Sequence, residues 1–300
     1  MAEFNVIKEC RYGKLIFNKN DMYIGKSLEL YGEYSEGEID LFRQIVHQGD
    51  TVLEVGANLG AHTLALAQLV GEGGRVHAFE PQRLVFQTLA GNLALNSVTN
   101  VFAYQKAVGE APGCIMVPVL DYRQEVNWGG LELGGWEQGE EVEQITVDSL
   151  SLTACHFIKV DVEGMELSVL KGAAQTIRRF EPLLYVENDR ADKSQALIDY
   201  LDELGYDLYW HKPPLYSESN YFGNKEDVFR QKRRDENGRE VFLSVVSVNM
   251  LCLPRSRQIN AQGFEKIIVG RKSAKQQPAK RRAEAKGGKA VCNRKSSPTA

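Results

Sequence analysis

The feature that most constrains this chain is the stretch 52–63, which reads Val-Leu-Glu-Val-Gly-Ala-Asn-Leu-Gly-Ala-His-Thr. A short apolar strand runs there into a turn with two glycines, and a helical pattern follows over 63–70. A second apolar strand, 76–79, then ends on the carboxylate Glu80. Glycines let backbone approach a ligand closely, and the free N–H groups of a helix start face the same space. The pattern therefore predicts a strand–helix–strand unit that holds a nucleoside.

The spacing of the glycines bears on which nucleoside is bound. The dinucleotide fingerprint is Gly-x-Gly-x-x-Gly, but after Gly56 this chain has Asn58 and Ala61 at the second and third glycine positions. Glu54, just before the turn, would repel a pyrophosphate and suits an ammonium group, and Glu80 is placed to accept hydrogen bonds from ribose hydroxyls. S-adenosylmethionine has an ammonium group, a ribose and no phosphate, which makes it the favoured ligand. A dinucleotide and a turn without a ligand are the alternatives.

Strands and helices alternate along most of the chain, which is typical of an α/β fold with a parallel sheet covered on both faces. Apolar runs predict strands at 52–55, 75–79, 100–106, 114–119, 144–147, 156–161, 183–187, 206–211 and 244–253. Helical patterns are found at 60–70, 82–95, 165–179 and 192–204. The segment 109–144 interrupts the alternation, and we expect this long insertion to serve as a lid or substrate loop.

Three regions are expected along the chain. They are an N-terminal cap at 1–48, a ligand-binding domain at 49–256 that includes the insertion 109–144, and a C-terminal extension at 257–300. Within the cap, short strands are predicted at 14–17 and 22–24. Ser35 and Glu38 fit a capping box before a helix that ends near His47.

Charge is distributed unevenly along the sequence. The net charge is −4, yet residues 271–300 hold ten Lys or Arg and one acid, which leaves 26 basic and 39 acidic groups in the other 270 residues. This basic tail has no apolar periodicity, so we expect it to be disordered. It could contact nucleic acid or an acidic partner, neither of which is expected to be the substrate, or it could be a solvated extension without a specific role.

Composition and cysteine usage favour a cytoplasmic globular protein. Hydrophobic residues make up 43% and charged residues 25% of the chain, which is ordinary for a soluble protein. No apolar run approaches the roughly 20 residues that span a bilayer, and the first residues lack the pattern of a secretory signal. The five cysteines are scattered without a Cys-x-x-Cys pair, which argues against a disulfide framework and a structural zinc site.

Four predicted strands end on or beside a carboxylate, namely Glu54, Glu80, Asp161 and Glu187. Ligands of open α/β sheets bind beyond the carboxyl ends of the strands, and a carboxylate there is costly to desolvate without a purpose. These four acids are therefore candidate site residues. Asp161, Glu163 and Glu187 could also ligate a divalent metal, but no spacing rule requires this, and we assign no metal ligands.

Taken together, the motifs resemble those of the FkbM-type methyltransferases. The similar segments are Tyr-Gly-Glu-Tyr-Ser (31–35), Glu-Val-Gly-Ala-Asn-Leu-Gly (54–60), Phe-Glu-Pro (79–81), Ile-Thr-Val-Asp-Ser-Leu (145–150) and Ile-Lys-Val-Asp-Val-Glu-Gly-Met-Glu (158–166). The resemblance implies a Rossmann-like class I methyltransferase with a seven-stranded, mostly parallel sheet whose last strand, 244–253, is antiparallel. It also implies O-methyl transfer from S-adenosyl-L-methionine to a hydroxyl of a sugar, glycan or natural product.

Carried onto this chain, the resemblance implies roles around the cofactor. The loop 56–60 would wrap the methionine part, Glu54 would face its ammonium group, Glu80 would hold the ribose hydroxyls, and Asp161 would lie beside the transferred methyl group. The implied cofactor-binding residues are Glu54, Gly56, Ala57, Asn58, Gly60, Glu80, Pro81, Ala107 and Val108.

An alcohol acceptor needs a base that removes its proton as the new bond forms. Asp161 and His211 are the candidates, with Glu187 orienting the hydroxyl or the base. Polar and aromatic loop residues suit a sugar acceptor, and the expected substrate contacts are Asn127, Trp128, Asn220 and Tyr221. Ordinary loop packing is the alternative for these four. Two other functions remain, an RNA methyltransferase aided by the basic tail and a non-catalytic protein that binds adenosylmethionine.

Overall fold

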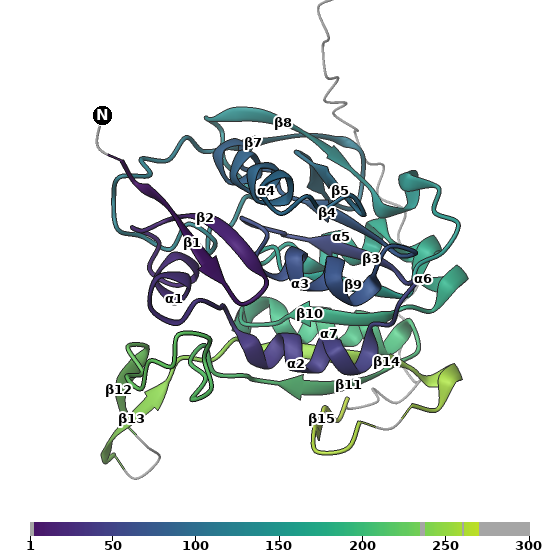
Figure 1. The fold of residues 1–300 in the computed structure, drawn as a ribbon. Coiled ribbons are helices and arrows are strands. Elements are labelled where there is room, and N and C mark those ends of the chain that lie inside the picture. Colours follow the sequence, from purple (N-terminus) through teal and green to yellow (C-terminus); the bar gives the residue numbers. More distant parts are fainter. Residues whose placement is uncertain (1–2, 235–237, 260, 270–300) are drawn as a thin grey trace, which may run out of the picture.

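A central sheet of eight strands organises the computed structural model, which describes residues 3–234, 238–259 and 261–269 (Figure 1). In spatial order the strands are β15 (Glu265–Lys266), β11 (Tyr206–His211), β14 (Asn249–Pro254), β10 (Leu183–Glu187), β9 (Phe157–Val160), β3 (Thr51–Val55), β4 (Arg75–Phe79) and β5 (Val101–Tyr104). The predicted α/β class is confirmed. The sheet has one strand more than predicted, because the two-residue β15 adds an edge beside β11.

Strand direction follows the prediction for this fold. The pairs β3–β4, β4–β5, β3–β9 and β9–β10 are parallel. β14 lies between β10 and β11 and is antiparallel to both. It begins at Asn249 rather than at residue 244, because Glu240–Ser244 forms β13 and pairs instead with β12 (Arg230–Arg234) in a separate two-stranded ribbon.

Helices cover both faces of the sheet. One face packs against α5 (Glu166–Gly172), α6 (Ala174–Phe180) and α7 (Ala191–Glu203), and the other packs against α2 (Glu36–Ile45) and α3 (Ala61–Val70). α4 (Arg83–Leu95) adds a third cluster around Leu89 and Leu93. Because side chains alternate along a strand, Val52 contributes to the α2–α3 face and Leu53 to the opposite one.

The predicted helix 165–179 is divided into α5 and α6. Gly172 ends α5 where the chain passes very close to the loop after β6 (Ala107–Val108). A Cβ atom at Gly172 would lie 2.0 Å from the carbonyl oxygen of Gly109. This close contact explains why a glycine stands at the break.

The N-terminal cap differs from its prediction in two places. Its hairpin consists of β1 (Asn5–Cys10) and β2 (Gly13–Asn18), and residues 22–24 lead into α1 (Ile24–Tyr31) instead of forming a strand. The reason is Asp21, whose carboxylate accepts hydrogen bonds from the backbone N–H groups of Tyr23 and Ile24 and so starts the helix. The expected capping box is wrong, because the Ser35 hydroxyl donates to the Glu38 carboxylate and caps no backbone N–H group.

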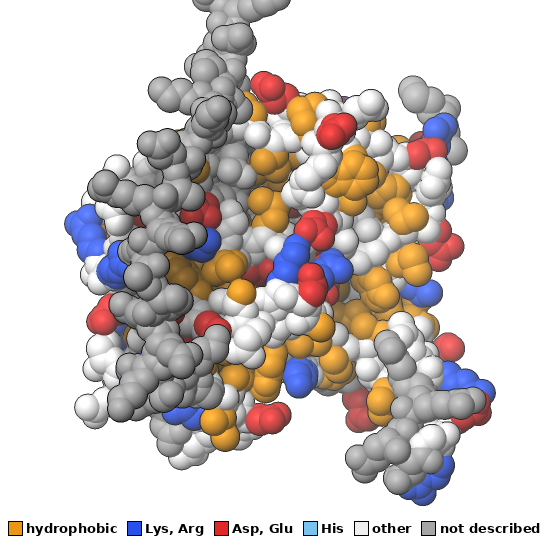
Figure 2. All heavy atoms as spheres, turned by 180° about the vertical axis from the view of Figure 1, so that it is seen from behind, with side chains coloured by type: hydrophobic (Ala, Val, Ile, Leu, Met, Phe, Trp, Pro, Cys, Tyr) orange, Lys and Arg blue, Asp and Glu red, His pale blue; other side chains and the backbone are white. Residues whose placement is uncertain are grey.

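The insertion 109–144 contributes β7 (Gly113–Val117) and most of β8 (Glu140–Ile145), which form a small sheet in the order β6-β8-β7. Short 3₁₀ turns follow at Val147–Leu150 and Arg255–Arg257. Within the described residues, no helix is long and apolar enough to cross a membrane. Figure 2 shows acidic and basic side chains side by side near the middle of the face turned away from Figure 1. The basic tail predicted from residue 271 lies outside the described residues.

Candidate active site

A cavity of about 390 Å³ opens at the carboxyl ends of β3, β4, β9 and β10. This volume lies in the range of small-molecule sites, and the position is the one where open α/β sheets bind ligands. Asn127, residues 129–131 and Leu133 of the insertion also line it, as do residues 245–249 at the start of β14. The site therefore combines the carboxyl ends of these strands with segments that lie far away in the sequence.

The glycine turn after β3 holds its shape through backbone contacts. Gly56 has a φ of 86°, and a Cβ atom there would lie 1.7 Å from the carbonyl oxygen of Asp161. The N–H groups of Gly56 and Ala57 both donate to the carbonyl of Phe79, at 3.0 and 2.9 Å. Only glycine therefore allows the ends of β3 and β9 to approach one another this closely. These two strand ends form one wall of the cavity.

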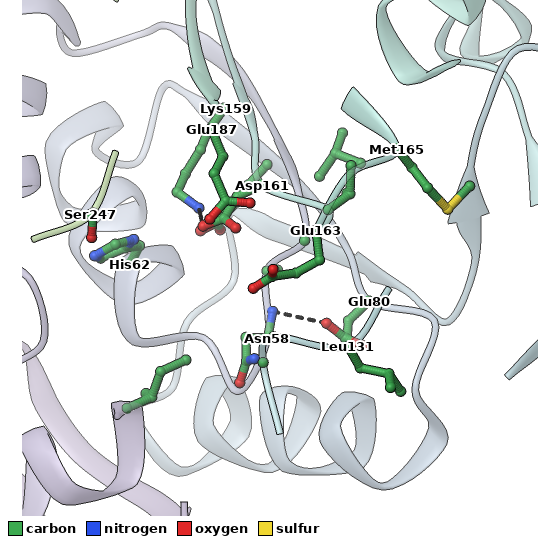
Figure 3. A pocket seen from close by; sticks show the side chains of 18 of the residues that line it. Asn58, His62, Glu80, Leu131, Lys159, Asp161, Glu163, Met165, Glu187 and Ser247 are labelled. Atoms are coloured by element: carbon green, nitrogen blue, oxygen red, sulfur yellow. Dashed lines mark hydrogen bonds and ion pairs between the residues drawn. The ribbon is translucent and has the colours of Figure 1, made fainter. Parts of the chain in front are cut away.

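Two buried carboxylates flank this turn. Glu54 is 1% exposed and accepts a 2.6 Å hydrogen bond from the Thr63 hydroxyl. Glu80 accepts bonds from the backbone N–H groups of Asn58 (3.1 Å) and Gln82 (2.8 Å), the first of which is drawn in Figure 3. Burial raises the pKa of each carboxyl to about 7, although the hydrogen bonds to each act in the opposite direction.

A buried lysine lies between the acids. Lys159 is 2% exposed, and its Nζ lies 2.8 Å from Asp161 Oδ2 (Figure 3). Burial alone would lower the pKa of Lys159, but the carboxylates of Asp161, Glu54 and Glu38 raise it above the ordinary value. The lysine is therefore charged and offsets part of the negative charge of the cavity. Sequence reasoning left its side chain undecided between pairing and facing outward, and the structure shows that it pairs.

Three carboxylates meet at the ends of β9 and β10. One oxygen each of Asp161, Glu163 and Glu187 lies within 4.8 Å of the other two. Glu163 also forms an ion pair with Arg190 at 2.5 Å. Burial, and then the Asp161 charge, raise the pKa of Glu163 to about 8 and that of Glu187 well above its ordinary value.

A further part of the lining comes from the cap, from the start of α3 and from the chain at the start of β14. It contains Tyr34, Glu38, His62, Ser247 and Asn249. Glu38 is 3% exposed and accepts a 2.8 Å bond from Ser35. His62 is buried, and desolvation together with Lys159 lowers its pKa to about 3, so its ring is neutral. Sequence reasoning assigned none of these residues to the site, although Tyr34 lies in the motif 31–35.

Most of the residues expected at the site line the cavity. Those found there are Glu54, Gly56, Ala57, Asn58, Glu80, Pro81, Ala107, Val108, Asn127, Asp161 and Glu187. Five are absent from the lining, namely Gly60, Trp128, His211, Asn220 and Tyr221.

Packing accounts for the first three of these differences. Gly60 begins α3, and a Cβ atom there would lie 2.7 Å from a methyl group of Leu89. The ring of Trp128 is buried and stacks on Tyr122 at 4.7 Å. Nδ1 of His211 lies 2.8 Å from the Tyr185 hydroxyl, on the sheet face that α2 covers. These three residues are packed against other parts of the fold and do not line the cavity.

The other two belong to a loop that supports the cap. The amide of Asn220 donates to the carbonyl groups of Ser217 and Asn224, so it stabilises its own turn. The backbone N–H of Tyr221 donates to the Glu33 carboxylate at 2.9 Å. The loop is polar because it makes these internal contacts, and the two residues lie outside the cavity.

The sheet order and the glycine turn beside two strand-end acids define a Rossmann-like α/β protein. The methyltransferase FkbM domain matches residues 54–208, and the chain belongs to the FkbM methyltransferase family. No curated protein sequence matches it significantly. The family assignment inferred from the motifs is thereby confirmed.

Several solved structures are similar to this one. An FkbM methyltransferase from Methylobacillus flagellatus KT has 16% sequence identity over 72% of this chain, with a TM-score of 0.42, and this chain spans only 50% of that protein. A precorrin-6y C5,15-methyltransferase from Geobacter metallireducens GS-15 has 12% identity over 73% of this chain and 85% of its own, with a TM-score of 0.43. An S-adenosylmethionine-dependent O-methyltransferase from Thermotoga maritima has 13% identity over 73% and 65%, with a TM-score of 0.40.

Proposed function

We propose that this protein transfers a methyl group from S-adenosyl-L-methionine to a hydroxyl of a sugar, glycan or natural product. The observation that carries the proposal is the pair of buried acids, Glu54 and Glu80, on either side of the Gly56 turn in one cavity. An ammonium group and a ribose diol are the ligand groups that such acids suit. Family membership supports methyl transfer, and the nature of the acceptor is our inference.

The residues present fit this cofactor. Glu54 would face the ammonium group, Glu80 would accept from the ribose hydroxyls, and Pro81, Ala107 and Val108 would border the adenine. Gln82 supplies an independent observation, because its side-chain oxygen is buried at the cavity with no hydrogen-bond partner among the described residues. An adenine amino group would satisfy an acceptor of this kind.

When bound, the cofactor supplies a methyl group on a positively charged sulfur. The chain must then hold the acceptor in line and remove its proton. We assign proton removal to Asp161, whose side chain is 35% exposed at the cavity, and orientation of the hydroxyl to Glu187. Lys159 holds Asp161 in place through its ion pair. His211 has no role in this scheme because it lies outside the cavity.

Charge narrows the class of acceptor. The cavity is lined by seven carboxylates but by only two lysines and one arginine. Two of these three cations, Lys159 and Arg190, are paired with acids of the same cavity. Lys106, the third cation, pairs with Glu143, so none of the three is free to bind a phosphate group, and we propose a neutral or cationic acceptor and disfavour RNA as the substrate. We keep the cytoplasm as the proposed location and leave the partner of the basic tail open.

The test is turnover of methyl-labelled adenosylmethionine against free sugars, oligosaccharides, nucleotide sugars and RNA. We expect label transfer to an uncharged hydroxyl compound, with the wild-type protein and with the Asp189→Asn variant but not with Asp161→Asn. Transfer to RNA alone would contradict the acceptor class. Failure to bind S-adenosylhomocysteine in calorimetry would contradict the function itself.

A further inference from the structure

The three carboxylates at the ends of β9 and β10 do not all have a cationic partner. Asp161 pairs with Lys159 at 2.8 Å, and Glu163 pairs with Arg190 at 2.5 Å. Glu187 has no such partner in the described part of the chain, and its Oε2 atom is buried without a hydrogen bond. A buried carboxylate oxygen without a donor is costly, so this atom indicates a ligand that is absent from the protein itself.

The charges of the group give the size of the deficit. Asp161, Glu163, Glu187 and the neighbouring Asp189 carry four negative charges when ionised, and Lys159 and Arg190 return two positive ones. Lys159 also compensates Glu54 and Glu38, so the cluster is short of positive charge, which a divalent cation would supply. Lys106, the third cation of the cavity, does not supply this charge, because it pairs with Glu143.

The spacing is that of an oxygen-ligand site. Three oxygens that lie at most 4.8 Å apart all fall within about 2.8 Å of a common point, so the side chains need to close by a few tenths of an ångström to reach the Ca²⁺ distances of about 2.3–2.6 Å. Mn²⁺ or Mg²⁺ would require them to close further, to about 2.1 Å in the case of Mg²⁺. Asp161 directly follows β9 and Glu187 ends β10, so the sheet holds their backbones, and Glu163 lies in the turn after β9 (Figure 3).

We propose that Asp161, Glu163 and Glu187 bind one divalent cation that prefers oxygen ligands. The site lies beside the position that we assign to the acceptor hydroxyl. An ion there would lower the pKa of a hydroxyl bound to it and make proton transfer to Asp161 easier. This role rests on the proposed function, whereas binding of the ion does not.

The experiment uses the metal alone with the full chain. MnCl₂ is titrated into the metal-free protein, and the electron paramagnetic resonance signal of free Mn²⁺ is followed at pH 8. We expect one bound ion per chain below about 1 mM, the weak end of oxygen-ligand affinities, with competition by Ca²⁺ and Mg²⁺. Glu187→Gln and Glu163→Gln should each weaken binding at least tenfold.

The matched control is Asp189→Asn, which removes the same charge from the same cavity but lies outside the three-residue cluster. This variant should bind Mn²⁺ with an affinity within about threefold of that of the wild type. Circular dichroism shows that each variant is folded. No Mn²⁺ binding by the wild type, or equal losses in Glu187→Gln and Asp189→Asn, would overturn the proposal. S-adenosylhomocysteine binding, measured separately, shows whether the proposed function stands when the metal site does not.

Discussion

Lys159 and Asp161 stand two residues apart at the end of β9, and their side chains meet at 2.8 Å inside the cavity. The strand's alternation puts both on the same face as Phe157, which packs under α2. The apolar core thus changes over one strand into a charged site. The buried ammonium group of Lys159 thereby compensates the negative charges of three acids, Asp161, Glu54 and Glu38.

Replacing that cation should destabilise the protein strongly. Lys159→Met leaves buried acids without compensation, and removal of one partner from a buried ion pair costs about 3–5 kcal/mol. We expect the free energy of unfolding in urea to fall by that amount at pH 8. The loss should be smaller at pH 5, where the carboxyl of Glu54, whose pKa is already raised to about 7, is protonated.

Lys106→Met is the matched control for this prediction. Lys106 also lines the cavity, but its pair with Glu143 is exposed, and such pairs contribute about 1 kcal/mol or less. Equal losses in the two variants would show that Lys159 has no special role.

Binding of S-adenosylhomocysteine should strengthen as pH rises through 7. The carboxyls of Glu54 and Glu80 have a pKa of about 7 in the free protein, and the ligand's ammonium and hydroxyl donors favour their ionised forms. Binding therefore releases protons below pH 7, and the affinity should rise about tenfold per pH unit for each linked group until the carboxyls are ionised. Calorimetry at pH 6, 7 and 8 measures this.

The Glu80→Gln variant tests the assignment behind that pH dependence. We expect its affinity at pH 8 to be about 10- to 100-fold lower, since hydrogen bonds to charged groups contribute about 1.5–3 kcal/mol. Its remaining pH dependence should be shallower than that of the wild type, because only Glu54 is left to titrate. An unchanged profile would place the titrating group elsewhere.

Methyl transfer should depend on Asp161 and not on His211. Asp161→Asn should lower kcat by about 10²- to 10⁴-fold, the range of general-base effects, while S-adenosylhomocysteine binding changes little. His211→Gln should keep kcat within about twofold, because His211 contacts Tyr185 and Phe264 outside the cavity. Single-turnover assays with labelled cofactor separate the two, and a large loss in the His211 variant would contradict the cavity as described.

Gly56 should tolerate no side chain. Gly56→Ala would place a Cβ atom 1.7 Å from the carbonyl oxygen of Asp161 at a φ of 86°, so both steric clash and backbone strain act against folding. We expect a loss of at least about 2 kcal/mol in unfolding free energy, from about 1–2 kcal/mol of left-handed strain plus the overpacking cost. Thermal unfolding measures this as a lower midpoint.

Gly73→Ala is the comparison for that substitution. A Cβ atom at Gly73 meets no atom within 4 Å, and its φ lies outside the left-handed region. It should leave the midpoint nearly unchanged or raise it slightly, because alanine restricts the unfolded chain. A midpoint lowered equally in both variants would mean that the close contact at Gly56 is not what requires the glycine.

Local sequence patterns were enough to predict the acids at the carboxyl ends of the strands. Glu54, Glu80, Asp161 and Glu187 could be assigned because each follows an apolar run, and parallel strands bring their carboxyl ends to one side. The same reasoning failed for His211. It also ends a strand, but its side chain faces the core under α2, and which face a strand residue takes depends on packing.

The sequence by itself determined the α/β fold, its glycine turn and the acids beside it, because these follow from hydrophobic periodicity and from residues close together in the chain. Only the tertiary structure decided the part of the lining where Tyr34 and Glu38 from the cap meet Ser247. It also decided that Lys159 pairs inward with Asp161. Contacts between segments some 200 residues apart form when the whole core closes, and no local pattern encodes them.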